Sequence, residues 1–460
     1  MTSYIIPYPK EINKNLFKED SNYKSISTLY GLPKDIKYCK KCVISNQRPC
    51  TTIEFKNTGK DAKDTIDFSS DGICDACRVR ELKTEINWKE REEELRDLCD
   101  QFRRHDGRYD CLVPGSGGKD SFMTAHLLKY KYGMNPLTCT WAPHIYTDWG
   151  WQNHQAWIHA GFDNILFTPN GKVHRILTRL ATEKLFYPFQ PFIVGQKTLA
   201  PKIAAQYDID LIFYGENQAE YGNPKGDMKS SQMQSKFFSS ASEDQIYLSG
   251  YSLSELREFG LTPADWKPYL PIDSEIFESK KIQYYYLGYY EKWHPQGAYY
   301  YSTENSNFSA APERTAGTYN TYNSIDDKVD DFHYHTTYIK FGIGRATYDA
   351  SQEVRSGDIT REEGVALIKK YDGEFPERWA KEIFEYLSMP NNLFKDISNI
   401  FEEPCFDRKY YDLLADNARS PHLWFLNKDN KWNLRKNIYD STNSTQEDTA
   451  QNWQGNTYST

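Results

Sequence analysis

The strongest chemical signal in the sequence is a hexapeptide after the apolar run YDCLVP: Ser116-Gly117-Gly118-Lys119-Asp120-Ser121. Small residues let the backbone turn sharply and bring its N–H groups up to an anion, and a following helix directs its positive end to the same place. The two hydroxyls can donate hydrogen bonds, Lys119 can neutralise phosphate charge, and Asp120 can hold a Mg²⁺. These roles fit ATP. The alternative is a glycine turn that only joins a strand to a helix.

The second signal is two CxxC pairs, formed by Cys39, Cys42, Cys74 and Cys77. Four thiolates in this arrangement predict a closed tetrahedral zinc site, whose role is to fold a small module. Unmetallated buried cysteines or disulfides are the alternatives. Cys50, close behind the first pair, is either a spare thiol or a substitute ligand. An odd total of nine cysteines fits metal binding in a reducing compartment better than a disulfide framework.

From Tyr109 onward, short apolar runs alternate with amphipathic stretches. The runs YDCLVP, PLTCTW, NILF and DLIFYG read as strands with helices between them, which predicts an α/β fold with a parallel sheet and flanking helices. In such sheets ligands bind at the carboxyl ends of the strands. Both the hexapeptide and Gly215-Glu216-Asn217 fall at such ends.

Composition shifts divide the chain further. Residues 231–335 are rich in Ser, Tyr and Asn, which predicts an irregular insertion that closes over a substrate or contacts a partner, or else a surface elaboration. The predicted organisation is an extension (1–35), a zinc-ribbon-like four-cysteine module (36–85), an ATP-binding α/β core (86–230), the insertion (231–335), a helical part that completes the site (336–438) and a flexible tail (439–460).

Composition also limits the partners. A formal charge of −8 over 460 residues weighs against broad capture of nucleic acid. The sequence has no run of about 18 apolar residues and no signal-like start, so we expect a cytoplasmic protein without membrane insertion. The 35 Tyr, 24 Phe and 11 Trp offer stacking surfaces for sugar or nucleotide rings, although ordinary core packing accounts for most of them.

The hexapeptide resembles the signature of PP-loop ATP pyrophosphatases, which split ATP between the α and β phosphates. A longer pattern is similar to the N-acetyl sugar amidotransferase family; it comprises CKKCVISNQRP, DGICDACR, VPGSGGKDS, YGEN and DDKVDDFHYHTTYIKFGIGRATYDASQEVRSGDITREEG. The resemblance implies conversion of an acetamido group into an acetamidino group on a nucleotide-activated sugar, for O-antigen, capsule or nonulosonic acid biosynthesis. It also implies ammonia from a separate glutaminase, relayed through a barrel-type channel protein, because no glutaminase residues are visible here.

Further residues are predicted to act beside the loop. Glu216 and Asn217 are expected to orient Mg²⁺, the acetamido group or ammonia, with a helix cap as the alternative. An acidic cluster with two histidines can supply a general base, with a solvated acidic surface as the alternative, and His333 is favoured because imidazole titrates near working pH. The cluster consists of Asp326, Asp327, Asp330, Asp331, His333 and His335.

Three basic residues are candidates for holding pyrophosphate or the nucleotide of the sugar: Lys340, Arg345 and Arg355. Surface salt bridges are the alternative for each. Trp141, at the end of the second strand, is predicted either to border the adenine or to pack in the core. Two rival functions remain open. One is tRNA thiolation, which requires further reactive cysteines. The other is a non-catalytic assembly subunit.

Overall fold

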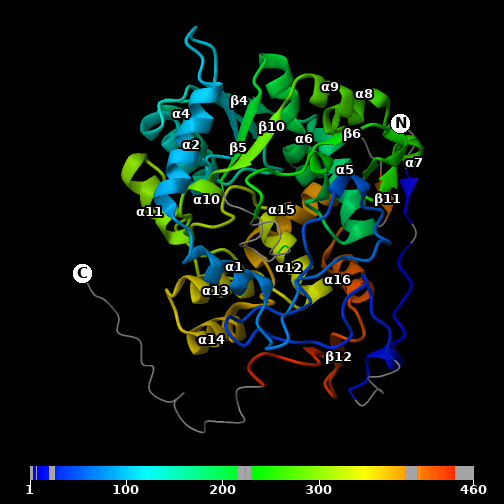
Figure 1. Cartoon of the computed structure of the whole chain (residues 1–460). Helices are drawn as coiled ribbons and strands as arrows, with labels where there is room; N and C mark the ends of the chain where they lie inside the picture. Colours follow the sequence, from blue (N-terminus) through cyan, green and yellow to red (C-terminus); the bar gives the residue numbers. More distant parts are fainter. Residues whose placement is uncertain are drawn as a thin grey trace.

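The computed structural model describes residues 4–6, 8–19, 26–215, 223, 229–388, 401–403 and 405–440. A five-stranded parallel sheet lies at its centre, which confirms the predicted α/β class (Figure 1). In spatial order its strands are β10 (Gln283–Tyr286), β5 (Leu211–Tyr214), β2 (Cys111–Pro114), β3 (Pro136–Trp141) and β4 (Asp163–Phe167). β2 and β5 are neighbours although β3 and β4 separate them in sequence. The chain therefore reverses its winding between them, where open sheets leave a ligand crevice.

Helices cover both faces of this sheet. Those preceding residue 210 are α1 (Asp75–Lys83), α2 (Trp88–Phe102), α3 (Lys119–His126), α4 (Asp148–His159), α5 (Gly171–Leu185) and α6 (Gln190–Tyr207). Leu112 and Ile212 pack into a core with α5 and α6, whereas their neighbours Val113 and Phe213 pack into a second core with α2, α3 and α4. Successive strand residues face opposite sides, so burial of both faces explains the continuous apolar runs.

The fifth strand differs from expectation, because β10 comes from the segment predicted to be an irregular insertion. Tyr284, Tyr285 and Tyr286 pair with β5 in parallel register and are buried. Aromatic residues favour strands, but tyrosine is common throughout this segment, so the three tyrosines of β10 did not stand out as a strand. The rest of the segment consists of short elements: β6 (Ser239–Ser240), β7 (Tyr247–Leu248), β8 (Tyr251–Ser252), α7 (Leu253–Leu256), α8 (Pro263–Trp266), β9 (Ile272–Asp273), α9 (Ser274–Ser279), α10 (Leu287–Tyr290) and α11 (Pro295–Asn305).

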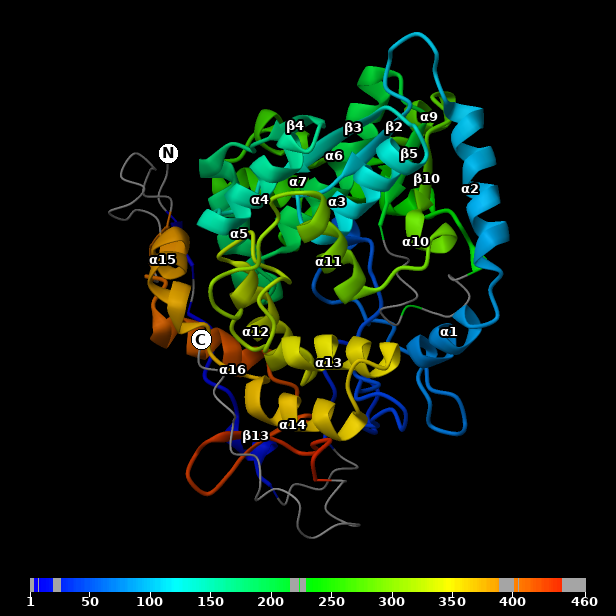
Figure 2. The same ribbon diagram turned by 90° about the vertical axis from the view of Figure 1, so that its left-hand side faces the viewer.

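The C-terminal part is mainly helical. Its elements are α12 (Asp330–Phe341), α13 (Arg345–Ser356), α14 (Arg361–Tyr371), α15 (Glu377–Ser388), β11 (Phe401–Glu403), α16 (Arg408–Ala418), β12 (Trp424–Leu426) and β13 (Trp432–Leu434). α14 begins with a capping box between Thr360 and Glu363. Figure 2 shows α12, α13 and α14 below the sheet, with α1 of the cysteine module close to α13. The N-terminal β1 (Tyr4–Ile5) pairs with β11.

The described residues also bear on membrane association. No helix among them combines the length and apolar character that a bilayer span requires.

Candidate functional site

The glycine loop, residues 115–121, follows β2 and leads into α3 through a turn with a left-handed glycine. Gly117 has a φ of +87°, and a Cβ there would lie 2.9 Å from both the Asn153 oxygen and His154 Cα. Only glycine fits this position without movement of α4. Gly118 is the N-cap of α3, and no described side chain caps it. The N–H groups of the first helical turn are therefore available to an external acceptor.

Two charged side chains of the loop form a pair. Lys119 Nζ lies 2.5 Å from Asp120 Oδ2, and Lys119 is only 6% exposed. Trp293 Nε1 donates to Asp120 Oδ1 at 2.9 Å, and Ser302 Oγ donates to the Lys119 carbonyl at 3.0 Å. α11 and the segment just before it therefore hold the start of α3. A hydrogen bond between the side chains of Ser116 and Asp326 holds the opposite end of the loop.

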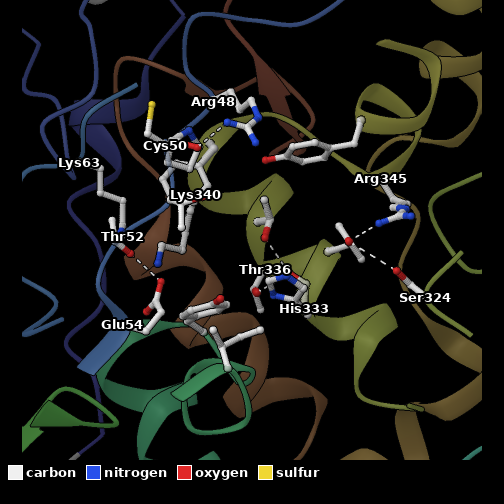
Figure 3. Close-up of a pocket in the computed structure, with 18 of the residues that line it drawn as sticks. Arg48, Cys50, Thr52, Glu54, Lys63, Ser324, His333, Thr336, Lys340 and Arg345 are labelled. Carbon is white, nitrogen blue, oxygen red and sulfur yellow. Dashed lines mark hydrogen bonds between the residues drawn. The ribbon is translucent and has the colours of Figure 1, made fainter. Parts of the chain in front are cut away.

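A cavity of about 580 Å³ opens beside Lys119 and Asp120. This volume lies within the range of about 300–1,000 Å³ that is typical of small-molecule sites. Its walls come from the cysteine module, the start of α3, the residues after α5, the first half of α6, and helices α12 and α13. Figure 3 shows side chains of the module, of α12 and of α13 around it. The ionisable residues that line it are Arg48, Cys50, Glu54, Lys63, Lys119, Asp120, Tyr187, Lys197, His333, Tyr334, Lys340, Arg345, Tyr348 and Asp349.

Basic side chains dominate this lining. Six Lys or Arg residues line the cavity against three Asp or Glu residues. Two of the three carboxylates are paired, because Asp120 contacts Lys119 and Asp349 lies 3.2 Å from Arg345 Nε. The remaining excess of positive charge favours an anionic ligand.

Lys340 is buried in the cavity wall on α12, with 7% of its surface exposed. Its Nζ donates to the Leu185 carbonyl at 2.8 Å and lies 4.9 Å from the centre of the Tyr30 ring. Burial, and then the charge of Lys63, lower the pKa of Lys340 to about 7, although Glu54 opposes the shift. Lys340 is therefore a lysine that exchanges a proton near neutral pH.

His333 also lines the cavity, but not with the properties expected of it. Its ring stacks on Phe189 at 4.9 Å, and its Nδ1 has no hydrogen-bond partner among the described residues. Burial, followed by the charges of Arg345 and Lys340, lowers its pKa to about 3. The imidazole is neutral at neutral pH and a weak proton acceptor. The reason for favouring it as a general base, titration near working pH, therefore does not hold here.

Arg345 lies at the start of α13 with its guanidinium over the Tyr334 ring, 4.4 Å from the centroid. It also donates to the Tyr334 hydroxyl and contacts Asp349. Figure 3 shows Arg345 and Ser324 on the same side of the cavity. Arg345 is thus oriented toward the cavity by contacts on its own helix and on α12.

The residues of the predicted acidic cluster lie in different environments. Asp327 accepts from His144 N and Nδ1, both at 2.7 Å, which is a structural role. Burial raises the pKa of Asp330 and raises that of Asp331 to about 7. His335 bonds Tyr411 in the core at 2.6 Å. None of these four residues lines the cavity.

Other predicted residues lie away from the cavity. Trp141 is 3% exposed and packs against Phe167 and Tyr269, so it has the core position that was its alternative. Arg355 does not line the cavity; its Nη1 contacts Cys42 Sγ at 3.8 Å. Glu216, Asn217 and the tail from residue 441 lie outside the described residues.

Several cavity residues escaped the sequence interpretation, above all Arg48, Glu54, Lys63 and Lys197. Three of them belong to the cysteine module, which was expected to be purely structural. The only available signal was the basic residue in SNQRPC, directly behind the first cysteine pair. Cys50 lines the same cavity and lies outside the four-sulfur cluster.

The four paired cysteines converge as predicted. Cys39 Sγ lies 3.8 Å from Cys77 Sγ, Cys42 Sγ lies 3.7 Å from Cys74 Sγ, and all four sulfurs lie within 4.8 Å of one another. A tetrahedral site with Zn–S bonds of about 2.3 Å has S–S edges of about 3.8 Å. Backbone N–H groups of Lys41, Cys42 and Cys74 also point at Cys39 Sγ. This cluster can hold a structural metal such as zinc.

Comparison with known proteins adds a biological context. Residues 316–439 match a family described as "LPS biosynthesis protein WbpG-like, C-terminal domain". The match supports a role in polysaccharide biosynthesis. The matched segment contains α12 and α13, which carry the cavity residues His333, Lys340 and Arg345.

A second similarity is to an uncharacterized protein of Methanocaldococcus jannaschii, MJ1599, which is 33% identical over 75 residues. The aligned part covers 16% of this chain and 27% of that protein. The chain thus spans about a quarter of the length of this relative.

Proposed function

We propose that this chain is an ATP-dependent amidotransferase that converts the acetamido group of an N-acetyl sugar into an acetamidino group. The observation that carries the proposal is the glycine loop at the carboxyl end of β2, whose Lys119 and Asp120 face a basic cavity. Another wall of that cavity comes from the segment that matches a polysaccharide-biosynthesis family. A nucleotide-activating loop and a sugar-related segment around one cavity suit an enzyme that activates a sugar with ATP.

The chemistry follows from the weakness of the amide as an electrophile. The acetamido oxygen attacks the α phosphorus of ATP, the bond between the α and β phosphates breaks, and pyrophosphate leaves. Ammonia then adds to the imidate carbon and loses a proton, after which the C–O bond breaks and AMP carries the oxygen away. The product is an acetamidine, and one ATP is consumed for each nitrogen transferred.

Each loop group has a role in this scheme. The N–H groups at the start of α3 and the Lys119 ammonium stabilise the charge that develops on the phosphates. Asp120 would hold a Mg²⁺, which would supply further positive charge to stabilise the phosphates. Lys340 and Arg345 are positioned to contact pyrophosphate or the sugar nucleotide. We retain His333 as a hydrogen-bonding group for the acetamido nitrogen, because its Nδ1 has no partner in the described structure. Lys340, with its pKa near 7, is the better candidate to accept a proton from ammonia.

Zinc in the cysteine cluster would be structural in this scheme, since four sulfurs leave no open position. Ammonia would come from a separate glutaminase, with a barrel-type channel protein between the two. We place the reaction in the cytoplasm, where ATP and nucleotide sugars are available.

The decisive experiment measures AMP, pyrophosphate and amidine formation by the purified chain with ATP, Mg²⁺ and ammonium, across a panel of nucleotide-linked N-acetyl sugars. We expect sugar-dependent release of AMP and pyrophosphate in equal amounts, and loss of both in Lys119→Met. Exposed Lys56→Met, on the surface of the cysteine module, is the matched control and should retain activity. Release of ADP instead of AMP would refute adenylation.

One observation favours a second candidate, sulfur transfer to tRNA. Cys50 places a thiol in the cavity wall, where a persulfide could reach an adenylated substrate. The experiment that separates the two functions is Cys50→Ala. Amidine formation should survive this change, whereas thiolation would be lost. The two cysteines that follow the loop in sequence do not support this candidate, because Cys139 is buried in the core and Cys405 lies outside the cavity.

A further inference from the structure

We propose that Arg48 of the cysteine module binds a phosphate group of the sugar substrate, so that the enzyme selects a phosphate-bearing, nucleotide-linked sugar over the free sugar. The inference rests on the proposed function and adds to it a specificity-determining residue from the cysteine module. Arg48 lines the cavity shown in Figure 3, on a wall contributed by the module and by α12 and α13.

The environment of Arg48 favours binding of an anion. The side chain is 7% exposed, its Nη1 donates to the Pro49 carbonyl at 3.1 Å, and its Nε has no hydrogen-bond partner in the described part of the chain. Its guanidinium carbon lies 5.7 Å from the centre of the Tyr348 ring, and no salt bridge to Arg48 occurs among the described residues. A buried guanidinium without an anionic partner is costly, and this cost falls when an anionic ligand binds. The planar fork of arginine suits phosphate oxygens, which it can bind through two parallel hydrogen bonds.

The backbone around Arg48 is fixed before any ligand binds. The Ile66 N–H donates to the Arg48 carbonyl at 2.9 Å, and the Arg48 N–H donates to the Ser45 carbonyl at 3.2 Å. The same turn is tied to the metal cluster by a hydrogen bond from Cys39 N to the Ile44 carbonyl at 2.9 Å. The cysteine module therefore presents Arg48 to the cavity in a preorganised position.

The phosphates of ATP and those of the sugar share this chemistry, but the geometry favours the sugar. The loop that suits ATP lies at the start of α3, with its own lysine and helix N-terminus. Arg48 lines the cavity from the cysteine module, and its guanidinium lies over the ring of Tyr348 on α13. A substrate with a phosphate at this wall and its acetamido group toward Lys119 would fill the cavity between two cationic ends.

The test is calorimetric titration of the full-length, zinc-loaded protein without turnover. The probes are N-acetylglucosamine, its 1-phosphate, its UDP derivative, and ATP with Mg²⁺. We expect the phosphorylated sugars to bind more tightly than the free sugar. Arg48→Met should weaken their binding by about 10- to 100-fold, as loss of a charge-assisted pair predicts, while ATP affinity stays within about twofold. Arg48→Lys should be intermediate, since it keeps the charge and loses the fork.

Lys56→Met removes the same charge from an exposed position of the module and should leave every affinity unchanged. Melting curves and zinc content equal to wild type verify that the Arg48 variants are folded. Equal loss of ATP and sugar-phosphate binding in Arg48→Met would assign Arg48 to ATP and overturn the proposal. Equal binding of free and phosphorylated sugars, or no binding of either, would also overturn the proposal. Intact discrimination without pyrophosphate release would instead refute the amidotransferase and leave the phosphate subsite standing.

Discussion

Substitution of Gly117 by alanine tests the glycine loop, because it adds both a conformational cost and a steric cost to the folded state. The residue has a φ of +87°, a left-handed conformation that costs about 1–2 kcal/mol for an L-residue. The new Cβ would also lie 2.9 Å from two backbone atoms of α4, well inside the optimal carbon contact of about 3.5–4.0 Å. Because backbone cannot rotate away as a side chain can, relief requires movement of the loop or of α4.

A second glycine isolates the steric part. Gly107 has a φ of +83°, but a Cβ there would meet nothing within 4 Å. Gly107→Ala should therefore lower the free energy of unfolding by only the conformational cost, about 1–2 kcal/mol. Gly117→Ala should add an overpacking cost of about 1–3 kcal/mol, for a total of about 2–5 kcal/mol.

Urea unfolding gives the two free energies, and titration with ATP and Mg²⁺ gives the affinities. Gly117→Ala should weaken ATP binding by at least about tenfold, which corresponds to about 1.4 kcal/mol, because displaced N–H groups no longer converge on the phosphates. Gly107→Ala should leave ATP binding unchanged. If the two variants were equally stable and bound ATP equally well, the close approach of the loop to α4 would not matter and the assignment of the loop would fail.

Further predictions follow from other parts of the site. Cys74→Ser should lose most of the bound zinc and melt at a lower temperature, as measured by metal analysis and thermal unfolding; full zinc content would contradict the four-sulfur site. Asp120→Asn should abolish pyrophosphate release while zinc content stays at the wild-type level; near-normal turnover would place the metal elsewhere. A buried lysine with its pKa lowered to about 7 binds fewer protons in the folded state than in the unfolded state, so the free energy of unfolding should rise between pH 7 and 9. Lys340→Met should flatten that rise, and an unchanged slope would contradict the shift. The isolated chain should use high ammonium but not glutamine, and glutamine hydrolysis by the chain alone would refute a separate glutaminase.

The fold was predictable wherever a local sequence pattern was enough to identify an element. β2 and β3 are buried along their whole length, so each appears as an apolar run, and residue types that favour sharp turns mark the loop after β2. β10 was not predictable, because its tyrosines lie in a segment where tyrosine is common throughout. Its membership of the sheet depends on pairing with β5, which is a long-range contact.

The site was predictable only in part, for a related reason. Lys119 and Asp120 belong to a local motif whose spacing implies chemistry, and the paired cysteines imply a metal by spacing alone. The sequence predicts His333 as a general base, but the pKa of His333 depends on Phe189, Arg345 and Lys340, which only the fold brings around it. No local pattern carries that information.

Hydrogen bonds connect the cysteine cluster to the helices that line the cavity, so a structural metal in the cluster would also stabilise the cavity. Arg355 on α13 contacts Cys42 Sγ at 3.8 Å, and Arg361 on α14 donates to the Cys42 and Cys39 carbonyls at 3.2 and 3.3 Å. Four thiolates around Zn²⁺ leave a net charge of −2, which these guanidiniums offset. α13 also carries Arg345, and the module carries Arg48, so two cavity walls are joined through the metal cluster. Loss of the metal would release both walls at once, whereas the glycine loop rests on the sheet and on α4.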